Sequence, residues 1–538
     1  MRYWGKRGKT IKAAFFGAAF TVFLLTGTAL TTYGAGRPSF LKSATYYSDD
    51  WVVNFWNSES SCMEEELAQI AADGFNSIIL VVPWQEFQPQ MEPVRYESYA
   101  LEKMDQVMEA AERHGLWVIL RLGYTWDYGN GSSADRYERL FYDGTVQNAW
   151  LDYVGKIYET AGSHSNFYGG FLTWEDFWNL LESSRSGGRS RAGIERAKQI
   201  GYQDFVRERY TIDQLKDQFG LDVDSYEDIW IPGEIERSFY VFYEFYDDFL
   251  NRMLRESQTV FPDLSMEVRL DVDPVPGEDG EKIGFSHAGT YGCQAAPYTC
   301  AMYSVSMGED QGKEITAAEA LKTMRELLSQ VKAYNGGKSL YIDQLLYMDN
   351  TPGFEDNARL AEGERAAFLE GADGVLESCT MGYGIWTYRN YGNNALYNSQ
   401  FALGEAGWDF DSGCKVVEKD GSMKAQLAVK NTISQDFSSR LGAGDTIKVR
   451  FQAKADGIAQ IWVTIGMETK YITVSGDEDV YLEFTQGGNR ITFSADREVW
   501  IDNVNVYTWE TDGGLYGIDG QPAGLIPSMR ILNQKTGN

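Results

Sequence analysis

Histidine and cysteine are scarce in this chain, with three and five residues among 538. The histidines His114, His164 and His287 provide little material for a histidine-rich metal site or for a triad with a histidine base. The cysteines form no CxxC motif, and their odd number leaves at least one thiol unpaired. Cys293 and Cys300 lie close enough in sequence to bridge a loop.

Positive charge is also in short supply. The 48 Lys and Arg residues are outnumbered by 78 Asp and Glu residues, which gives a formal net charge of −30. Such a surface repels the phosphates of nucleic acids and anionic lipid headgroups, so we expect neither as a partner. The charge suits a protein that handles neutral or cationic ligands, and it is equally compatible with a role in solubility alone.

Long apolar runs are confined to the N-terminus. Basic residues within 1–12 precede an apolar run from Ala13 to Leu30, and small residues follow at 34–36. This pattern predicts a signal peptide or a membrane anchor over residues 1–36. We therefore expect a secreted protein or one tethered at the extracellular face of the cell membrane, and the pattern leaves cleavage of the leader open.

Strand-like apolar runs alternate with helical periodicity over residues 37–404, which is typical of parallel βαβ units. No GxGxxG or GxxxxGK[ST] motif follows a strand, so a nucleotide-binding sheet is not indicated. Eight such steps predict a (β/α)₈ TIM barrel, with a polar helical insertion at about 180–236. The expected strands are 51–56, 76–82, 116–122, 170–174, 264–270, 298–305, 339–344 and 382–387.

Short alternating strands separated by Gly, Asp and Asn turns begin at about residue 405. They include 446–451, 460–465 and 499–504, and they predict an antiparallel β-sandwich over 405–510. The tail at 511–538 carries few signals, and we expect it to lie against the body or to be partly loose.

Function in a barrel collects at the carboxyl ends of the strands. The expected ends carry carboxylates among aromatic and arginine side chains, and aromatic residues make up 14% of the chain. Cleavage of a glycosidic bond needs such a set: one carboxylic acid protonates the leaving oxygen, and a second carboxylate attacks the anomeric carbon or activates water. The candidate substrate-binding residues are Trp84, Glu86, Arg121, Trp126, Trp174, Arg269, Tyr303, Gln344 and Trp386. Packing, or orientation of a carboxylate, is the alternative role for these side chains.

Three segments carry a resemblance to a known group. Residues 169–176 (GGFLTWED), 205–215 and 384–388 (GIWTY) resemble segments of the retaining (β/α)₈-barrel glycoside hydrolase clan that includes cellulase-like and β-galactosidase-like families. The similarity extends in organisation over about residues 48–400. It implies that Glu175 is the general acid/base and that the nucleophile lies at the end of the seventh strand. The C-terminal sandwich resembles jelly-roll carbohydrate-binding modules, or it braces the barrel without binding sugar.

The seventh strand departs from the clan pattern, which has Glu at the nucleophile position. This chain has Asp343 followed by Gln344, so Asp343 becomes the candidate nucleophile. If Gln344 occupies that position instead, the barrel binds glycan without cutting it, or Glu86, Glu267 or Asp349 serves.

The sequence therefore predicts an extracellular glycoside hydrolase that acts on a poly- or oligosaccharide by a two-carboxylate, retaining mechanism. The alternative is a catalytically inactive, glycan-binding or cell-wall-associated barrel protein. No cofactor is required for this chemistry, and a structural calcium in the sandwich would use Asp502 as a ligand.

Overall fold

The fold is taken from a computed structural model. It describes residues 36–59, 62–124, 132–173, 188–233, 236–269, 275–276, 282–283, 295–305, 313–347, 358–437, 446–511 and 513–537. Residues Arg37–Asn538 form one compact unit, and the expected leader lies in the other, outside the described residues. Within the described ranges, no helix combines the length and the apolar character needed to cross a membrane.

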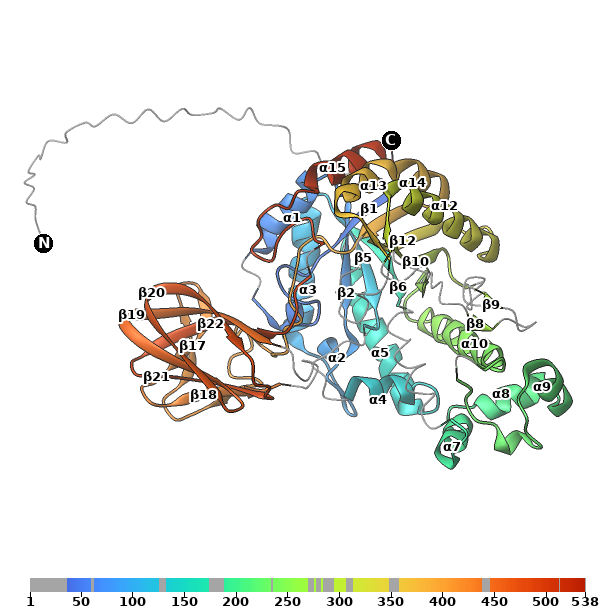
Figure 1. Ribbon diagram of the computed structural model, residues 1–538, viewed down its shortest axis with the longest axis horizontal. Coiled ribbons are helices and arrows are strands. Elements are labelled where there is room, and N and C mark those ends of the chain that lie inside the picture. The colour runs from blue at the N-terminus through green and yellow to red at the C-terminus, as the bar shows by residue number, and fades with distance from the viewer. Residues whose placement is uncertain are drawn as a thin grey trace, which may run out of the picture. The chain divides into compact units, whose positions relative to one another are not determined.

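Eight parallel strands close into a barrel in the order β1-β14-β12-β10-β7-β6-β5-β2, with helices around them (Figure 1). This arrangement confirms the predicted (β/α)₈ barrel. The strands are β1 (Leu41–Thr45), β2 (Ser77–Val82), β5 (Trp117–Leu122), β6 (Phe167–Leu172), β7 (Ser265–Arg269), β10 (Thr299–Ser304), β12 (Leu340–Leu346) and β14 (Gly382–Ile385).

The predicted first strand at 51–56 is wrong. The first strand is β1, and residues Asn54–Asn57 form a 3₁₀ helix, η1. Trp56 is buried there and donates from its indole N–H to the carbonyl of Val81 at 2.9 Å. Periodicity does not separate a short buried apolar run from a strand. The true strand is inconspicuous because it carries polar residues inward: Ser43 Oγ lies 2.7 Å from Ser77 Oγ inside the barrel.

Helices surround the barrel, and the longer ones pack apolar faces against the outer side of the strands. These helices are α1 (Met63–Ala72), α2 (Trp84–Phe87), α3 (Ser98–Arg113), α4 (Ser132–Arg139), α5 (Gly144–Ala161), α10 (Phe239–Ser257), α12 (Ala317–Tyr334), η3 (Glu362–Glu364), α13 (Arg365–Gly371) and α14 (Asp373–Cys379). The predicted capping box at Thr316 and Glu319 is present at the start of α12. Three small two-stranded sheets complete this part: β3 (Gln90–Met91) with β4 (Val94–Arg95), β8 (Val275–Pro276) with β9 (Lys282–Ile283), and β11 (Glu314–Ile315) with β13 (Arg359–Leu360).

The described part of the insertion is helical, as predicted. It contains α7 (Arg191–Gln199), α8 (Tyr202–Arg209), α9 (Ile212–Phe219) and η2 (Tyr226–Asp228). The Tyr202 ring packs edge-on against Phe242 of α10, with ring centroids 5.2 Å apart. This contact packs the insertion against α10, the helix at which the alternation of barrel strands and helices resumes.

The C-terminal sandwich is built from β15 (Asp409–Phe410), β16 (Lys415–Lys419), β17 (Ser422–Leu427), β18 (Thr432–Asp436), β19 (Ile447–Ile465), β20 (Glu468–Phe484), β21 (Arg490–Ala495) and β22 (Val499–Tyr507). The predicted strands at 446–451 and 460–465 are the two ends of β19. The first half of β19 pairs with β22 and the second half with β21, so this strand and its partner β20 run through both layers. Leu396 and Phe401 belong to the sandwich core, ahead of the predicted border at 404.

The tail is ordered against the barrel. Helix α15 (Ile526–Lys535) buries Met529 and Leu532 in the same core cluster as the barrel helices. Of the two expectations for the tail, packing against the body is therefore the one observed.

Candidate functional site

Alternation along the strands sends one set of side chains into the barrel. Ile119, Phe171 and Tyr341 share an interior cluster, while their neighbours pack outward against the helices. Other inward positions of the strands are polar. Arg121 of β5 and Glu267 of β7 are both buried there, with exposures of 2% and 0%.

Arg121 joins two of the central strands. Its Nη2 donates to Thr173 Oγ1 at 2.9 Å and lies 3.7 Å from Glu267 Oε2. Thr173 directly follows β6 and is the last described residue before the predicted acid/base, Glu175. The guanidinium therefore fixes the end of β6, two residues before Glu175, against a buried carboxylate.

Asp343 sits at a β-bulge in β12. Ile342 pairs with Ala301 and Gln344 pairs with Met302, so Asp343 is the extra residue between them. The register against β14 shifts at the same place. A bulge re-aims a side chain and is common beside functional sites. Asp343 is fully buried, with 0% of its surface exposed.

The inward groups influence one another electrostatically. Burial raises the pKa of the Cys300 thiol well above its usual range, and the nearby charges of Asp343 and Glu267 raise it further. The positive charge of Arg121 opposes that rise. Asp343, Glu267 and Arg121 thus lie around the neutral Cys300 thiol, and we call these four residues the inner cluster. Cys300 is a free thiol, and Cys293, the partner that the spacing allowed, lies outside the described residues.

A network of hydroxyl groups adjoins the inner cluster. The Tyr341 hydroxyl donates to Ser43 Oγ at 2.7 Å, and Ser43 contacts Ser77. Burial raises the pKa of Tyr341 well above its usual range, and the charge of Asp343 adds to this. Tyr341 therefore remains a neutral hydrogen-bonding group beside the carboxylate.

Several predicted site residues lie outside the described residues. These are Glu175, Trp126 and Trp174, together with the alternative carboxylate Asp349. Arg269 ends β7, but its side chain is also outside the described part. Their roles stay predictions, and the described Thr173 gives the position from which residues 174 and 175 continue.

Two predicted substrate contacts are corrected. Trp84 is fully buried among Tyr137 and Trp150, and its indole N–H donates to Gln88 at 2.8 Å. The packing alternative therefore accounts for it. Tyr303 points out of the barrel, because its hydroxyl donates to the Ala320 carbonyl of α12 at 3.4 Å. With Cys300 pointing inward, strand alternation turns a residue three positions later outward.

Three further predicted contacts lie on the carboxyl-end side of the strands. Glu86 in α2 accepts from Asn57 Nδ2 at 3.2 Å. Trp386 follows β14, is partly exposed, and its ring centroid lies 5.7 Å from that of Tyr47. Gln344 is buried beside Asp343. Their contact with substrate remains a prediction.

Sequence reasoning missed Thr173 and Cys300 as members of the site. Thr173 could have been found from the period of two along β6, which places it on the same face as Phe171. Cys300 gave no such signal, because only its position opposite Glu267 in the β7–β10 register shows its neighbours.

Metal ligation finds no support in the described ranges, which contain no group of three or more His, Cys, Asp or Glu side chains placed to hold an ion. Asp502, the expected calcium ligand, accepts hydrogen bonds from Lys424 Nζ at 3.0 Å and Ser422 Oγ at 3.1 Å. A calcium ion in the sandwich stays an untested prediction.

No protein-family model and no curated protein matches the chain. Among solved structures, the chain is similar to a GH5_18 protein from Streptomyces cattleya in complex with GlcNAc, at 13% identity and a TM-score of 0.42, covering 66% of this chain and 73% of that one. It is also similar to a β-galactosidase from the psychrophilic Marinomonas ef1, at 14% identity and a TM-score of 0.44, covering 65% and 54%. These low values carry no inference about activity. The chain is a closed (β/α)₈ barrel followed by an antiparallel β-sandwich, as its own strand order shows.

Proposed function

We propose that the protein is a glycoside hydrolase that cleaves glycosidic bonds in a poly- or oligosaccharide. The observation that carries this proposal is the inner cluster: Asp343 and Glu267 are buried carboxylates from different strands, and the charges of both act on Cys300 in the barrel interior. Arg121 ties this cluster to the strand that leads into Glu175. The reaction needs two carboxyl groups on opposite sides of one anomeric carbon, and we assign these roles to Asp343 and to Glu175.

In the proposed reaction, Glu175 protonates the glycosidic oxygen while Asp343 attacks the anomeric carbon from the opposite face. Glu175, now a carboxylate, then deprotonates the water that releases the sugar from Asp343, with net retention of configuration. Asp343 carries one methylene less than the Glu typical of the clan, and the bulge at Ile342–Gln344 changes the path of the backbone where this shorter side chain leaves it. Arg121 serves as a positioning residue for the β6 end through Thr173.

The test is turnover of aryl glycosides and oligosaccharides built from β-linked mannose, glucose, galactose and xylose. We expect Glu175→Gln and Asp343→Asn to lose about 10²–10⁴-fold in turnover. Glu208→Gln, an exposed carboxylate of the insertion, is the control and should match wild type. Turnover that persists in both Glu175→Gln and Asp343→Asn would remove the proposed mechanism.

A second candidate function is a silent barrel that binds glycan without cutting it. The full burial of Asp343 favours it, because a sugar reaches this carboxylate only if the residues over it move. Gln344 beside Asp343 favours it as well. Glycan binding by wild type with no turnover on any member of the panel would select this function.

We also propose that the protein works outside the cell, on the strength of the basic and apolar pattern at residues 1–36. Fractionation of expressing cells tests this: the chain should appear in the medium or in the membrane fraction with protease-accessible domains. Recovery only as a soluble protein inside the cell would contradict it.

A further inference from the structure

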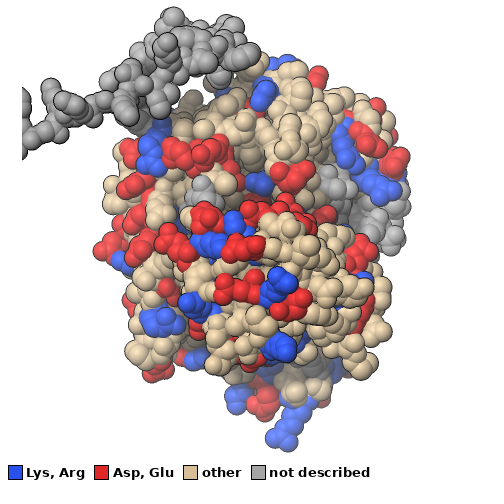
Figure 2. All heavy atoms as spheres, turned by 90° about the vertical axis from the view of Figure 1, so that its left-hand side faces the viewer, with Lys and Arg blue, Asp and Glu red and all other residues tan. Residues whose placement is uncertain are grey.

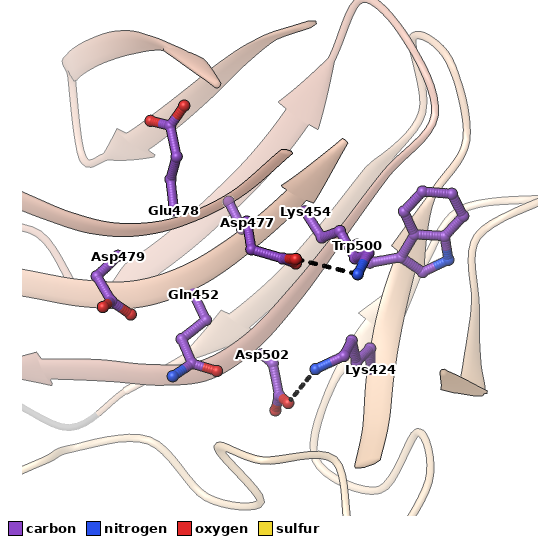
Figure 3. Close-up of a pocket in the computed structure, with 9 residues that line it drawn as sticks. Lys424, Gln452, Lys454, Asp477, Glu478, Asp479, Trp500 and Asp502 are labelled. Atoms are coloured by element: carbon purple, nitrogen blue, oxygen red, sulfur yellow. Dashed lines mark hydrogen bonds and ion pairs between the residues drawn. The ribbon is translucent and has the colours of Figure 1, made fainter. Parts of the chain in front are cut away.

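The outer face of the sandwich is hollowed across four neighbouring strands, β20, β19, β22 and β17 (Figure 3). The hollow measures about 290 Å³. The backbone register aligns Asp479, Gln452 and Asp502 across three of these strands. The intervening residues Ala453 and Ile501 point into the sandwich core, so the aligned side chains point outward. The hollow is therefore a polar surface of the sheet, and register shifts in β19 lie on both sides of it, at Arg450/Gln452 and at Ala455/Ala459.

Ion pairs hold part of this surface in place. Lys424 Nζ lies 3.0 Å from Asp502, and Lys454 Nζ lies 3.1 Å from Asp477 and 2.7 Å from Asp420. Figure 3 shows the first two pairs reaching toward each other from neighbouring strands. An ammonium has three donors and a carboxylate accepts several hydrogen bonds, so each pair keeps unused capacity. The lining acids outnumber these two lysines, so the hollow stays acidic.

Two groups in the hollow are available to a ligand. The side chains of Gln452 and Asp479 make no hydrogen bond or ion pair with another described residue. An amide and a carboxylate are suited to donate to and accept from vicinal hydroxyl groups. Asp479 and the neighbouring Glu478 add negative charge, which disfavours an anionic chain. These observations favour a neutral polyhydroxyl ligand.

The hollow continues toward the barrel. A second cavity of about 500 Å³ shares Gln452 and Asp502 with it and extends to Ser48 and Arg389. Ser48 lies on the segment that follows β1, and Arg389 on the segment that follows β14. Both segments leave the carboxyl ends of barrel strands, where catalysis is proposed. The two cavities meet at Gln452 and Asp502, and we call them together the trough, which extends from the sandwich face to the barrel rim. Figure 2 shows acidic and basic side chains side by side on the face of the molecule that it turns toward the viewer.

We propose that the trough binds the distal units of a neutral glycan chain whose reacting bond lies at the barrel mouth. This inference rests on the proposed glycoside hydrolase function and specifies its substrate as a long, uncharged chain. The sandwich then contributes binding subsites to the same substrate that the barrel cuts.

The experiment compares wild type with the double variant Gln452→Ala/Asp479→Ala in the full chain. Both side chains are exposed and make no internal bonds to described residues, so the variant should fold normally. Tyr471→Ala is the matched control, because Tyr471 is 68% exposed on the part of β20 that belongs to the other sheet. Migration is measured in native gels cast with galactomannan, mixed-linkage β-glucan, xylan or, as the anionic reference, polygalacturonate.

We expect at least one neutral polysaccharide to retard wild type and Tyr471→Ala, and the double variant to lose about tenfold in affinity, as expected for one or two missing hydrogen bonds. KM for a hexasaccharide should rise by a similar factor, while turnover of an aryl monoglycoside stays unchanged. Three results would overturn the trough proposal. These are equal retardation of wild type and the double variant, no retardation of any of the proteins, or a loss of retardation in Tyr471→Ala and not in the double variant.

The outcomes separate the two proposals. If no glycan is hydrolysed but the polysaccharide retards wild type and no longer retards the double variant, the trough binds glycan and only the hydrolase proposal is rejected. If glycan is hydrolysed, and wild type and the double variant have the same KM for the hexasaccharide, the hydrolase proposal stands and the trough proposal is rejected. If polygalacturonate retards wild type but not the double variant, the proposal of a neutral ligand is contradicted.

Discussion

The buried carboxylate of Asp73 binds the guanidinium of Arg530, with Oδ1 lying 2.7 Å from Nη2 and 2.8 Å from Nε. Asp73 closes helix α1, and Arg530 lies in the C-terminal helix α15, so the contact joins the two ends of the described barrel. The hydroxyls of Tyr388 and Tyr516 donate to the other oxygen of Asp73, at 2.7 and 2.9 Å. A single acid therefore satisfies three partners from the last third of the chain.

Replacing Asp73 by Ala should cost the barrel about 2–4 kcal/mol in the free energy of unfolding, because buried donors lose their acceptor. Arg530→Ala should cost much less than Asp73→Ala, since the Arg530 side chain is 46% exposed and its pair is screened by water. Urea denaturation monitored by tryptophan fluorescence measures both. A larger effect from Arg530→Ala than from Asp73→Ala would be inconsistent with the assigned roles.

Gly384 keeps Asp343 in place. A Cβ at this position would lie 2.8 Å from the Asp343 carbonyl oxygen and 2.4 Å from Ile79 Cδ1. Gly384→Ala should therefore displace the bulge and lower both the melting temperature and the turnover. Gly374→Ala is the matched control, because a Cβ there meets nothing within 4 Å and alanine favours the helix. Normal activity and stability in Gly384→Ala would show that the bulge tolerates the displacement.

Asp50 makes the stability depend on pH. Burial raises its pKa to about 7, with Asp49 adding to the rise and Lys103 opposing it. An unfolded Asp titrates at about 4, so between pH 4 and 7 the folded state holds a proton that the unfolded state has lost. Asp50 thus stabilises the fold fully below about pH 4, and this contribution is lost as the pH rises through 7. The pKa of Lys103 is lowered to about 8 by burial, so Lys103 stays charged over most of this window.

The melting temperature of wild type minus that of Asp50→Asn should therefore decrease as the pH rises from about 4.5 to about 7.5, a range that spans the titration of Asp50. The neutral Asn mimics the protonated acid, so the two proteins should be close in stability at the acidic end. Taking the difference removes the contribution of the other carboxylates of this acidic chain. A constant or rising difference would refute the assignment.

Seven of the eight barrel strands were predictable because a buried parallel strand is a continuous apolar run bounded by turn residues. The first strand was missed for the opposite reason: Ser43 faces the polar interior, while the more apolar stretch around Trp56 packs as η1 outside the barrel. Local hydrophobicity reports burial, but it does not say which buried layer a segment occupies.

The site was predictable only to the level of strand ends. Tyr303 and Trp84 lie at such ends, yet both turn away from the barrel interior, because alternation and the short helix α2 decide the direction of each side chain. The bulge that isolates Asp343 arises from pairing with β10 and β14, and such long-range pairing leaves no mark in the local sequence. Arg121 was predicted, whereas its link to Thr173 became visible only once β5 and β6 were paired.

The most direct test of the central claim is covalent trapping of the nucleophile. Wild type is incubated with the 2-deoxy-2-fluoro glycoside of whichever sugar it hydrolyses, because the fluorine slows release of a glycosyl–enzyme intermediate that passes through an oxocarbenium-like transition state. Peptide mass mapping should locate one glycosyl unit on Asp343, and Asp343→Asn should carry none. An adduct on Glu267 or another acid, or turnover with inversion and no adduct, would contradict the account.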